Sequence, residues 1–366
     1  TEEGAACTGT SAPTTVAVGH DGEVNPRLLR RFKAIEPLAE APDAVASLGR
    51  TLFHDSRLSA KGEMSCASCH PLDRFGVDGK AITGKRNVPT VLNASLAFTQ
   101  YWDGRAPSLE EQAKRPILDS TEMGMRDGDA VVARISAIPE YRSAFESAFP
   151  SQEEPITFDN VGRAIAAFER RLITPSRWDR YLSGEMAALT PKEKGGLKIF
   201  LNSGCMVCHT GPLVGGATFE RLGVVEPWPN QTDVGRMAIS GQPADRMSFK
   251  VPSLRNVAKT APDGHDGASP DGADAVRRMG RHQLGIDLAN DEVDGIVAWL
   301  GALTGVSAET AAPASRLKVW MKANAAPAIA SGSFDGLSAA FERMRALDPN
   351  GAAYPEWSRF ANAGAA

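Results

Sequence analysis

The pattern Cys-x-x-Cys-His occurs twice in this chain, as CASCH at residues 66–70 and as CMVCH at residues 205–209. The chain has 366 residues but only five cysteines and six histidines, so the two motifs use four of the five cysteines. Each motif brings two thiols and one imidazole together within five residues. The fold must therefore present this constellation at two places that are far apart in the sequence.

Three kinds of site use cysteine pairs of this spacing. A c-type haem takes both thiols as thioether links to the porphyrin and the adjacent histidine as the proximal iron ligand. A thioredoxin-like redox pair does not need the histidine and favours a βαβ setting, which the flanking residues do not offer. A zinc site would combine the two pairs, but their separation is far outside the usual spacing. The motifs therefore predict two covalently bound c-type haems, held by Cys66, Cys69 and His70 and by Cys205, Cys208 and His209.

Composition limits the class of protein. Apolar residues make up 42% and charged residues 23% of the chain, which is ordinary for a soluble protein. The net charge of −4 argues against a nucleic-acid-binding surface, and no apolar run approaches the length of a membrane span. Covalent haem attachment takes place outside the cytoplasm, so we expect a periplasmic protein whose export signal is absent from this sequence. For Cys7, the lack of a preceding apolar stretch favours an unpaired thiol in a loose tail over a lipid anchor.

Helical periodicity is the main secondary-structure signal. Residues 43–53 and 190–202 predict a helix before each motif, residues 158–172 predict a helix capped by Asp159, and residues 290–305 predict a closing helix capped by Asn290. The predicted fold is mainly α, with two cytochrome c-like haem domains, long loops and a helical C-terminal extension. The predicted boundaries are a flexible tail at 1–25, haem domains at 26–175 and 176–305, and the extension at 306–366.

Several longer segments resemble one known family. LGRTLFHDSRLS precedes the first motif, and RNVPTVLNAS, YWDGRAPSLEEQAKRPI, FKVPSLRNVAKT and MGRHQLG follow it in this order. Together they are similar to the bacterial di-haem cytochrome c peroxidases, a family that includes MauG, which oxidises tryptophans of a partner protein. The resemblance covers about residues 44–305. It implies that peroxide reacts at the N-terminal haem and that the C-terminal haem handles electrons.

The resemblance also implies a second axial ligand for the C-terminal haem. The family usually supplies a methionine from the Met-Gly-Arg segment, which is Met279 here. A thioether is a soft ligand that raises the potential of iron, as suits an electron store. Without the resemblance, Met279 would be read as core filler. His265 and His282 are the alternative ligands.

The family's distal and relay residues match four positions of this chain. Glu122 is expected to be the acid-base group that takes a proton from peroxide and delivers it to the leaving oxygen. Gln112 would orient the peroxide, and Pro116 would help to shape the pocket. Trp102 would carry an oxidising equivalent between the haems, although a core role is usual for so bulky a residue.

A calcium site is also implied by the resemblance. Its ligands match the side-chain oxygen of Asn87 and the backbone carbonyls of Thr260 and Pro262, with water completing the shell. Hard oxygen ligands of this kind suit calcium.

One departure from the family pattern affects the first haem. Many members place a histidine in the loop after the first motif, where it blocks the resting iron, but residues 71–88 contain no histidine. The first iron is therefore expected to be open in the oxidised protein. MauG-like members share this feature, but they can carry tyrosine where this chain has Met279.

Three functions remain open from the sequence. The first is a hydrogen peroxide-dependent peroxidase with a small cytochrome c or a cupredoxin as electron donor. The second is a MauG-like oxidase of tryptophans in a partner protein, and the third is a di-haem electron carrier without catalysis. Glu122 and Gln112 beside an open iron favour an enzyme over a carrier. A homodimer is left open.

Overall fold

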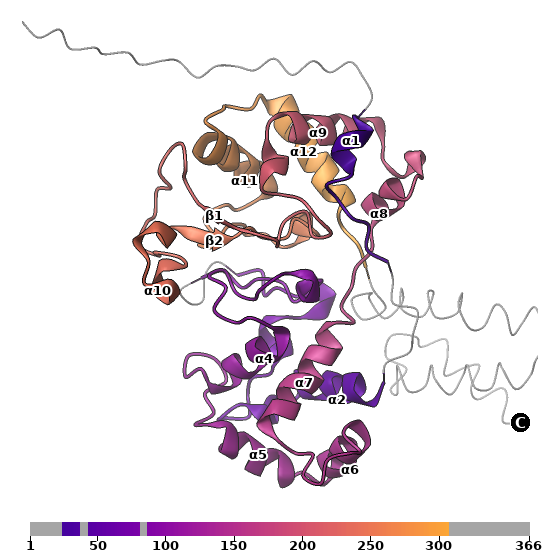
Figure 1. Ribbon diagram of the computed structural model, residues 1–366, viewed down its shortest axis with the longest axis vertical. Coiled ribbons are helices and arrows are strands. Elements are labelled where there is room, and N and C mark those ends of the chain that lie inside the picture. The colour runs from indigo at the N-terminus through magenta and orange to yellow at the C-terminus, as the bar shows by residue number, and fades with distance from the viewer. Residues whose placement is uncertain (1–23, 37–42, 81–85, 307–366) are drawn as a thin grey trace, which may run out of the picture. The chain divides into compact units, whose positions relative to one another are not determined.

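The computed structural model describes residues 24–36, 43–80 and 86–306 (Figure 1). The predicted tail with Cys7 and the predicted extension after Val306 lie outside the described residues. Helices dominate the described ranges, as predicted, and their strands are two three-residue segments that pair antiparallel, Phe219 opposite Lys250. None of the described helices combines the length and apolar character needed to cross a membrane.

The elements follow the chain in this order. The helices are α1 (Pro26–Leu29), α2 (Ala44–His54), α3 (Cys66–Cys69), α4 (Leu109–Leu118), α5 (Gly128–Ser136), α6 (Pro139–Ala148), α7 (Phe158–Glu169), α8 (Arg177–Leu182), α9 (Pro191–Asn202), α10 (Met237–Ser240), α11 (Gly272–Met279) and α12 (Asn290–Ala302). The strands are β1 (Phe219–Arg221) and β2 (Ser248–Lys250). Short 3₁₀ turns are η1 (Ser56–Leu58), η2 (Leu72–Arg74), η3 (Ala94–Leu96), η4 (Met186–Ala188), η5 (Cys205–Val207), η6 (Pro243–Asp245) and η7 (Val257–Lys259), and a π-helical turn, η8 (Gly280–Leu284), follows α11.

The helix before the first motif crosses α7 at a glycine. The α2 helix begins after Asp43, whose carboxylate accepts a hydrogen bond from Ala46 N at 2.7 Å. A Cβ on Gly49 would lie 1.8 Å from the carbonyl oxygen of Ala164, so only glycine permits this approach of α2 to α7. The crossing fixes the direction in which the chain enters the first motif.

The helix before the second motif is held in the same way. Thr190 and Glu193 form a reciprocal capping box at the start of α9. A Cβ on Gly196 would lie 1.7 Å from the carbonyl oxygen of Gly295, and α9 packs against α12 at this point (Figure 1). Each motif therefore follows a helix that a glycine contact locks to a second helix.

Two hydrophobic clusters lie on either side of the link at residues 173–177. The first runs from Leu48 to Leu172, and the second takes in Trp178 to Leu303. Phe32 belongs to the second cluster, because Gly211 N donates to Arg31 O at 2.8 Å and Ile35 N donates to the Asp179 carboxylate at 2.7 Å. This corrects the sequence assignment of residues 26–35 to the N-terminal domain.

Two predicted helix caps also differ from the structure. The α7 helix is capped by Thr157, whose hydroxyl accepts from Asn160 N at 3.1 Å, and Asp159 lies inside its first turn. Asn290 is the first residue of α12 and Ala289 precedes it. Thr157 caps α7 because its hydroxyl lies three residues before Asn160, where it can accept from a backbone N–H that has no partner within the helix. Asp159 is already inside the first turn and does not have this position.

A buried polar network joins loops of the two halves. Asn93 donates from Nδ2 to the hydroxyl of Thr174 at 2.8 Å and accepts from Thr174 N at 2.8 Å. Asn256 donates to the same hydroxyl at 2.9 Å. All three side chains are buried, so loops from both halves are held in register at their shared boundary.

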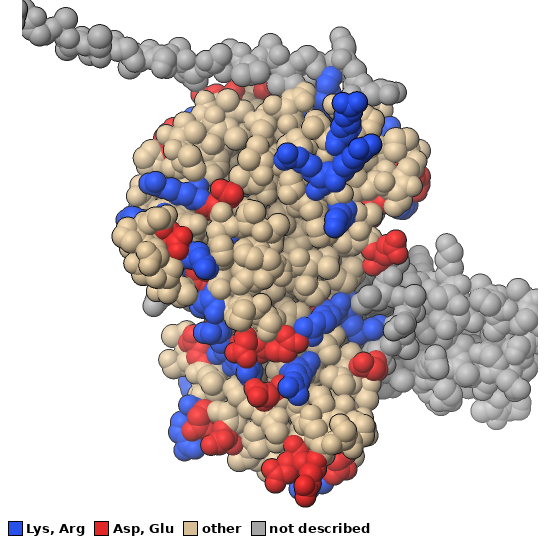
Figure 2. All heavy atoms as spheres, in the orientation of Figure 1, with Lys and Arg blue, Asp and Glu red and all other residues tan. Residues whose placement is uncertain are grey.

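Charge is not distributed evenly on the face drawn in Figure 2. Acidic and basic side chains stand interspersed over the elements built by residues 43–172, while much of the surface over the C-terminal half carries neither sign. On this face the basic side chains of the C-terminal half gather mainly near α1 and α9.

Candidate active site

The histidines of the two motifs are oriented alike. His70 Nδ1 lies 2.9 Å from Gly76 O, and His209 Nδ1 lies 3.0 Å from Val214 O. In each case the carbonyl accepts a hydrogen bond from Nδ1–H, which leaves Nε2 unprotonated as the ligating nitrogen. Burial lowers the pKa of both imidazoles, that of His209 to about 4, so both are neutral near pH 7. Neutral imidazole with a fixed tautomer is the form that binds iron.

The thiols of the motifs are not suited to redox exchange between themselves. The four cysteines form no disulfide. Burial raises the pKa of Cys66 and of Cys205 to about 12. A thioredoxin-like pair needs a lowered thiol pKa, so these sites contradict that alternative and fit thiols that are consumed in covalent links.

Both motifs open into one cavity. Its volume is about 1780 Å³, against the ~300–1,000 Å³ of an ordinary small-molecule site. Residues of both halves line it, among them Cys69, His70, Cys205, Cys208 and His209. The space and its ligands fit two large planar groups, one on each histidine.

The predicted distal residues meet at this cavity. Gln112 and Pro116 lie on α4 and Glu122 follows its end, and all three line the cavity with His70. Partial loss of water raises the pKa of Glu122, and repulsion from Asp119 raises it further, while Arg105 lowers it. A carboxyl group with a raised pKa is better matched to proton transfer near neutral pH.

Pro116 has a structural consequence that reaches the pocket. Proline has no N–H to donate to the carbonyl four residues earlier, which is that of Gln112. The hydroxyl of Tyr101 donates to this Gln112 carbonyl at 3.4 Å instead. Because Pro116 leaves the Gln112 carbonyl free to accept this hydrogen bond, α4 is connected to the Tyr101–Trp102 turn.

That turn is held on several sides. Tyr101 has φ of 67°, and the guanidinium of Arg105 lies 3.5 Å from the centre of its ring. The Trp102 indole donates to Asn87 O at 2.9 Å, and Trp102 O accepts from Lys250 N at 2.7 Å. Trp102 thus lines the cavity in a fixed position, in contact with strand β2 of the other half.

An ion-pair network fixes the neighbouring loops. Arg86 donates to Asp103 at 2.5 Å and to Asp233 at 2.6 and 2.8 Å, and Arg105 donates to Asp103 at 3.1 Å. Gly104 is required between them, because a Cβ there would lie 2.3 Å from the ring of Phe219. These contacts set the loop that carries Trp102 against the C-terminal half.

The structure distinguishes among the three candidates for the second protein ligand of the C-terminal haem. Met279 lines the cavity at the point where α11 passes into the π-helical turn, a distortion that often marks functional sites. His282 does not line it, and its Nδ1 lies 3.1 Å from Glu226 O. His265 lines the cavity, 4.2 Å from Phe249 and 6.5 Å from Trp102 between ring centres.

Two of the three predicted calcium ligands, Asn87 and Pro262, contact each other. The Asn87 amide donates from Nδ2 to Pro262 O at 2.6 Å and to Gly264 O at 3.1 Å, and Thr260 lines the cavity with them. Among the described residues, no cluster of three or more acidic, histidine or cysteine side chains could hold a metal ion. Any cation here would depend on neutral oxygens.

Comparisons with known proteins identify the family. The family model for di-haem cytochrome c peroxidase matches residues 43–187. A cytochrome c551 peroxidase of Nitrosomonas europaea is 43% identical over 286 residues, which cover 76% of this chain and 84% of that protein. The chain belongs to the di-haem cytochrome c peroxidase family. The predicted family and the predicted enzyme class, an oxidoreductase of the cytochrome c peroxidase type, are confirmed.

Two further relatives belong to the MauG branch of the family. The methylamine utilization protein MauG of Methylophilus methylotrophus is 32% identical over 291 residues, 73% of this chain and 84% of that protein. The crystal structure of a MauG-like protein associated with microbial copper homeostasis is 31% identical, with a TM-score of 0.65 over 77% of this chain and 96% of that chain. A di-haem family implies two haems, in agreement with the two motifs.

Sequence reasoning missed two charged groups of this peroxidase-family cavity. Glu169 is 3% exposed, its Oε2 has no hydrogen-bond partner, and burial raises its pKa to about 8. Lys250 lies at the cavity with its ammonium 2.9 Å from Thr99 O, and burial lowers its pKa to about 8. Glu169 belongs to a predicted helix and Lys250 to the segment FKVPSLRNVAKT, and nothing in either local sequence distinguishes them from surface charges.

Proposed function

We propose that this protein is a di-haem c-type peroxidase that reduces hydrogen peroxide at an open N-terminal haem. Electrons would reach that haem from a redox partner through the C-terminal haem, which His209 and Met279 would hold. The observation that supports this most directly is the cavity that Glu122 and Gln112 share with His70. Residues 36–175 and 176–305 would form the two haem domains, with residues 26–35 packed against the second, and each haem would be linked covalently to its motif.

The distal residues would divide the work at the first haem. The bound haem supplies the iron at which peroxide is held and reduced. The Glu122 carboxylate would take a proton from the bound peroxide and return it to the departing oxygen. Gln112 would orient the peroxide by a hydrogen bond, and Pro116 would keep α4 in the conformation that presents Gln112.

Trp102 would relay oxidising equivalents between the haems. Its indole lines the cavity, donates to Asn87 O and is held by β2 through Lys250 N. A rigid indole loses little energy to reorganisation when it changes charge, which favours repeated one-electron steps. Its place between loops of both halves supports this role.

We also propose calcium at Asn87, Thr260 and Pro262. The Asn87 amide already contacts Pro262 O, so a turned amide would bring its oxygen beside that carbonyl. The ion would tie the loop after the first motif to the segment before α11. Its oxygen ligands suit calcium rather than a transition metal.

The alternative is a MauG-like oxidase of tryptophans in a partner protein. The absence of histidine from residues 71–88 and the MauG relatives support it. Met279, where MauG-like proteins can have tyrosine, and the higher identity to cytochrome c551 peroxidase favour the peroxidase. The donor would then be a small cytochrome c or a cupredoxin in the periplasm, and a carrier without catalysis would have no use for Glu122.

The open first iron gives the test of this function. We expect the fully oxidised protein to react with hydrogen peroxide without prior reduction, because the loop at 71–88 has no histidine to occupy the iron. Stopped-flow mixing with peroxide, followed by the haem spectrum, measures this. A spectral change that appears only after one haem has been reduced would contradict the open site.

The second prediction concerns Met279. Met279→Ala removes the thioether, so the potential of the C-terminal haem should fall and any near-infrared sulfur-to-iron band should disappear, with both haems still attached. Met247→Leu is the matched control, because Met247 is 3% exposed in the same hydrophobic cluster but does not line the cavity. An unchanged potential in the Met279 variant would point to His265, which also lines the cavity.

A further inference from the structure

A second tryptophan at the cavity has an environment that the other described tryptophans lack. The Trp228 indole is 2% exposed and lines the cavity, and it donates from Nε1 to the Asp266 carboxylate at 2.9 Å. Trp102 donates to a backbone carbonyl, and the Nε1 atoms of Trp178 and Trp299 have no partner. Among the four tryptophans that the structure describes, only Trp228 is paired with an acid.

Trp228 is connected to both of the groups that the proposed function uses. It forms a hydrophobic cluster with Met247 and Phe249, against which Trp102 and Met279 pack. The ring of His265 lies 6.5 Å from that of Trp102 and 6.4 Å from that of Trp228, so aromatic contacts run from one indole to the other. An oxidising equivalent on Trp102 therefore has a short path to Trp228.

The charges around Trp228 favour the loss of an electron. An indole that gives up an electron becomes positively charged and acidic at Nε1. The Asp266 side chain is 9% exposed, so its carboxylate acts in a medium of low dielectric, where a nearby opposite charge has a large effect. Burial lowers the pKa of the neighbouring His265, so that imidazole stays neutral near pH 7 and adds no opposing charge.

Arg278 is a cation close to the ring and acts in the opposite sense. Its guanidinium carbon lies 5.8 Å from the Trp228 ring centre, about twice as far as the carboxylate lies from Nε1. The guanidinium is also paired with Asp274 at 2.6 Å, which offsets its charge. The nearer, buried carboxylate therefore dominates.

We infer that Trp228 and Asp266 form a redox-active pair that stores one oxidising equivalent from the peroxide reaction when no donor is bound. This rests on the proposed function. One electron leaves the indole and reduces the peroxide-oxidised haem by one equivalent, while the Nε1 proton moves to Asp266 Oδ2. The products are a neutral indolyl radical and a carboxylic acid. One electron from the donor protein and the return of that proton to Nε1 restore the pair.

The experiment treats the full haem-loaded protein with one equivalent of hydrogen peroxide in the absence of donor. Rapid freeze-quench EPR detects the radical, and indole-deuterated tryptophan identifies it. We expect a tryptophan radical in the wild type, its loss in Trp228→Phe, and a lower yield or shorter lifetime in Asp266→Asn, which cannot accept the proton. Trp299→Phe is the control, because Trp299 is equally buried but has no acid partner and does not line the cavity, and it should keep the radical.

The haem spectrum recorded on the same samples separates this inference from the proposed function. A peroxide-dependent spectral change without a tryptophan radical, or with the wild-type radical yield in Trp228→Phe, would overturn the role of Trp228 alone. Wild-type yield and lifetime in Asp266→Asn would overturn the role of the carboxylate. A wild type whose haem does not respond to peroxide would overturn both. If Trp228→Phe loses haem or fails to fold, Trp228→Tyr tests the same site, since the signal should change from an indole to a phenoxyl radical, and an unchanged indole signal would overturn the assignment.

Discussion

Glu122→Gln is expected to slow the reaction with hydrogen peroxide by a factor of about 10² to 10⁴, or about 3 to 5 kcal/mol of barrier. Neutral peroxide is a poor ligand and its anion a good one, and the same proton must reach the oxygen that leaves as water. The glutamine keeps the size and polarity of Glu122 at the cavity but cannot take up and return a proton. Haem content and the potential of the C-terminal haem should not change, because neither depends on that carboxylate.

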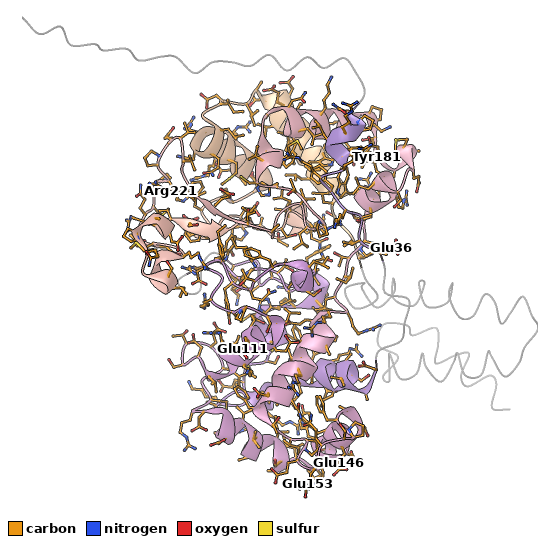
Figure 3. The ribbon with its side chains drawn as sticks, in the orientation of Figure 1. Glu36, Glu111, Glu146, Glu153, Tyr181 and Arg221 are labelled. Carbon is orange, nitrogen blue, oxygen red and sulfur yellow. The ribbon has the colours of Figure 1, made fainter. Side chains whose placement is uncertain are left out.

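Stopped-flow rates at several peroxide concentrations measure the effect. Glu111→Gln is the matched control, since Glu111 lies on α4 outside the cavity and pairs with Lys114 at 2.8 Å on the surface (Figure 3). Loss of that exposed pair costs at most about 1 kcal/mol of stability and should leave the rate unchanged. A Glu122 variant that reacts at nearly the wild-type rate would exclude it as the proton-transfer group, and Gln112 would become the next candidate.

The same carboxyl group should set the acid limb of the pH profile. Loss of water around Glu122 and repulsion from Asp119 raise its pKa above the usual 4.5. Glu122 must be ionised to take the peroxide proton, so the rate should fall as the pH falls through this raised pKa. In Glu122→Gln the acid limb should disappear along with most of the rate.

Local patterns were sufficient for much of the fold. The helices before both motifs, α2 and α9, follow from apolar periodicity and from caps within three residues, because such interactions connect neighbours in the chain. The cysteines and histidines of the motifs could be found for the same reason. The predicted distal residues came from longer matching segments, and their roles stay predictions.

What the sequence could not provide depends on contacts between distant segments. Phe32 reads as part of the N-terminal domain, and only its packing against Trp178, with ring centres 5.4 Å apart, assigns it to the other core. Trp228 lies in a loop without periodicity, and its acid partner is 38 residues away in sequence. No local signal distinguishes such a pair from an ordinary loop tryptophan and a surface aspartate.

The largest expected effect on stability comes from a buried ion pair in the C-terminal half. The Arg255 side chain is 0% exposed, and its guanidinium donates to both oxygens of Asp179 at 2.7 and 2.8 Å. The same carboxylate accepts from Ile35 N and Ser176 N, so it holds the first described segment, the start of α8 and the loop before η7 together. Asp179→Asn would leave Arg255 as an uncompensated buried charge.

We therefore expect Asp179→Asn to lower the free energy of unfolding by about 3 to 5 kcal/mol, measured by urea denaturation of the haem-loaded protein. Glu185→Gln is the control. Glu185 pairs with Arg180 at 2.9 Å, and the two side chains are 52% and 56% exposed, so this pair should contribute only about 0 to 1 kcal/mol. Equal losses in the two variants would contradict the assignment of a special role to the buried pair.

The pH dependence of stability gives an independent check on the same pair. Burial alone would raise the pKa of Asp179, but the Arg255 guanidinium and the two backbone N–H groups outweigh it, so the pKa lies below its usual value of 3.8. A carboxyl group with a lowered pKa in the folded state contributes stability above its unfolded pKa, and this contribution is lost as the pH falls through the folded pKa. The stability difference between wild type and Asp179→Asn should therefore be full at pH 6 and should narrow below about pH 4. Once the wild-type carboxylate is protonated, the Arg255 guanidinium is left without its charged partner, just as it is in the variant.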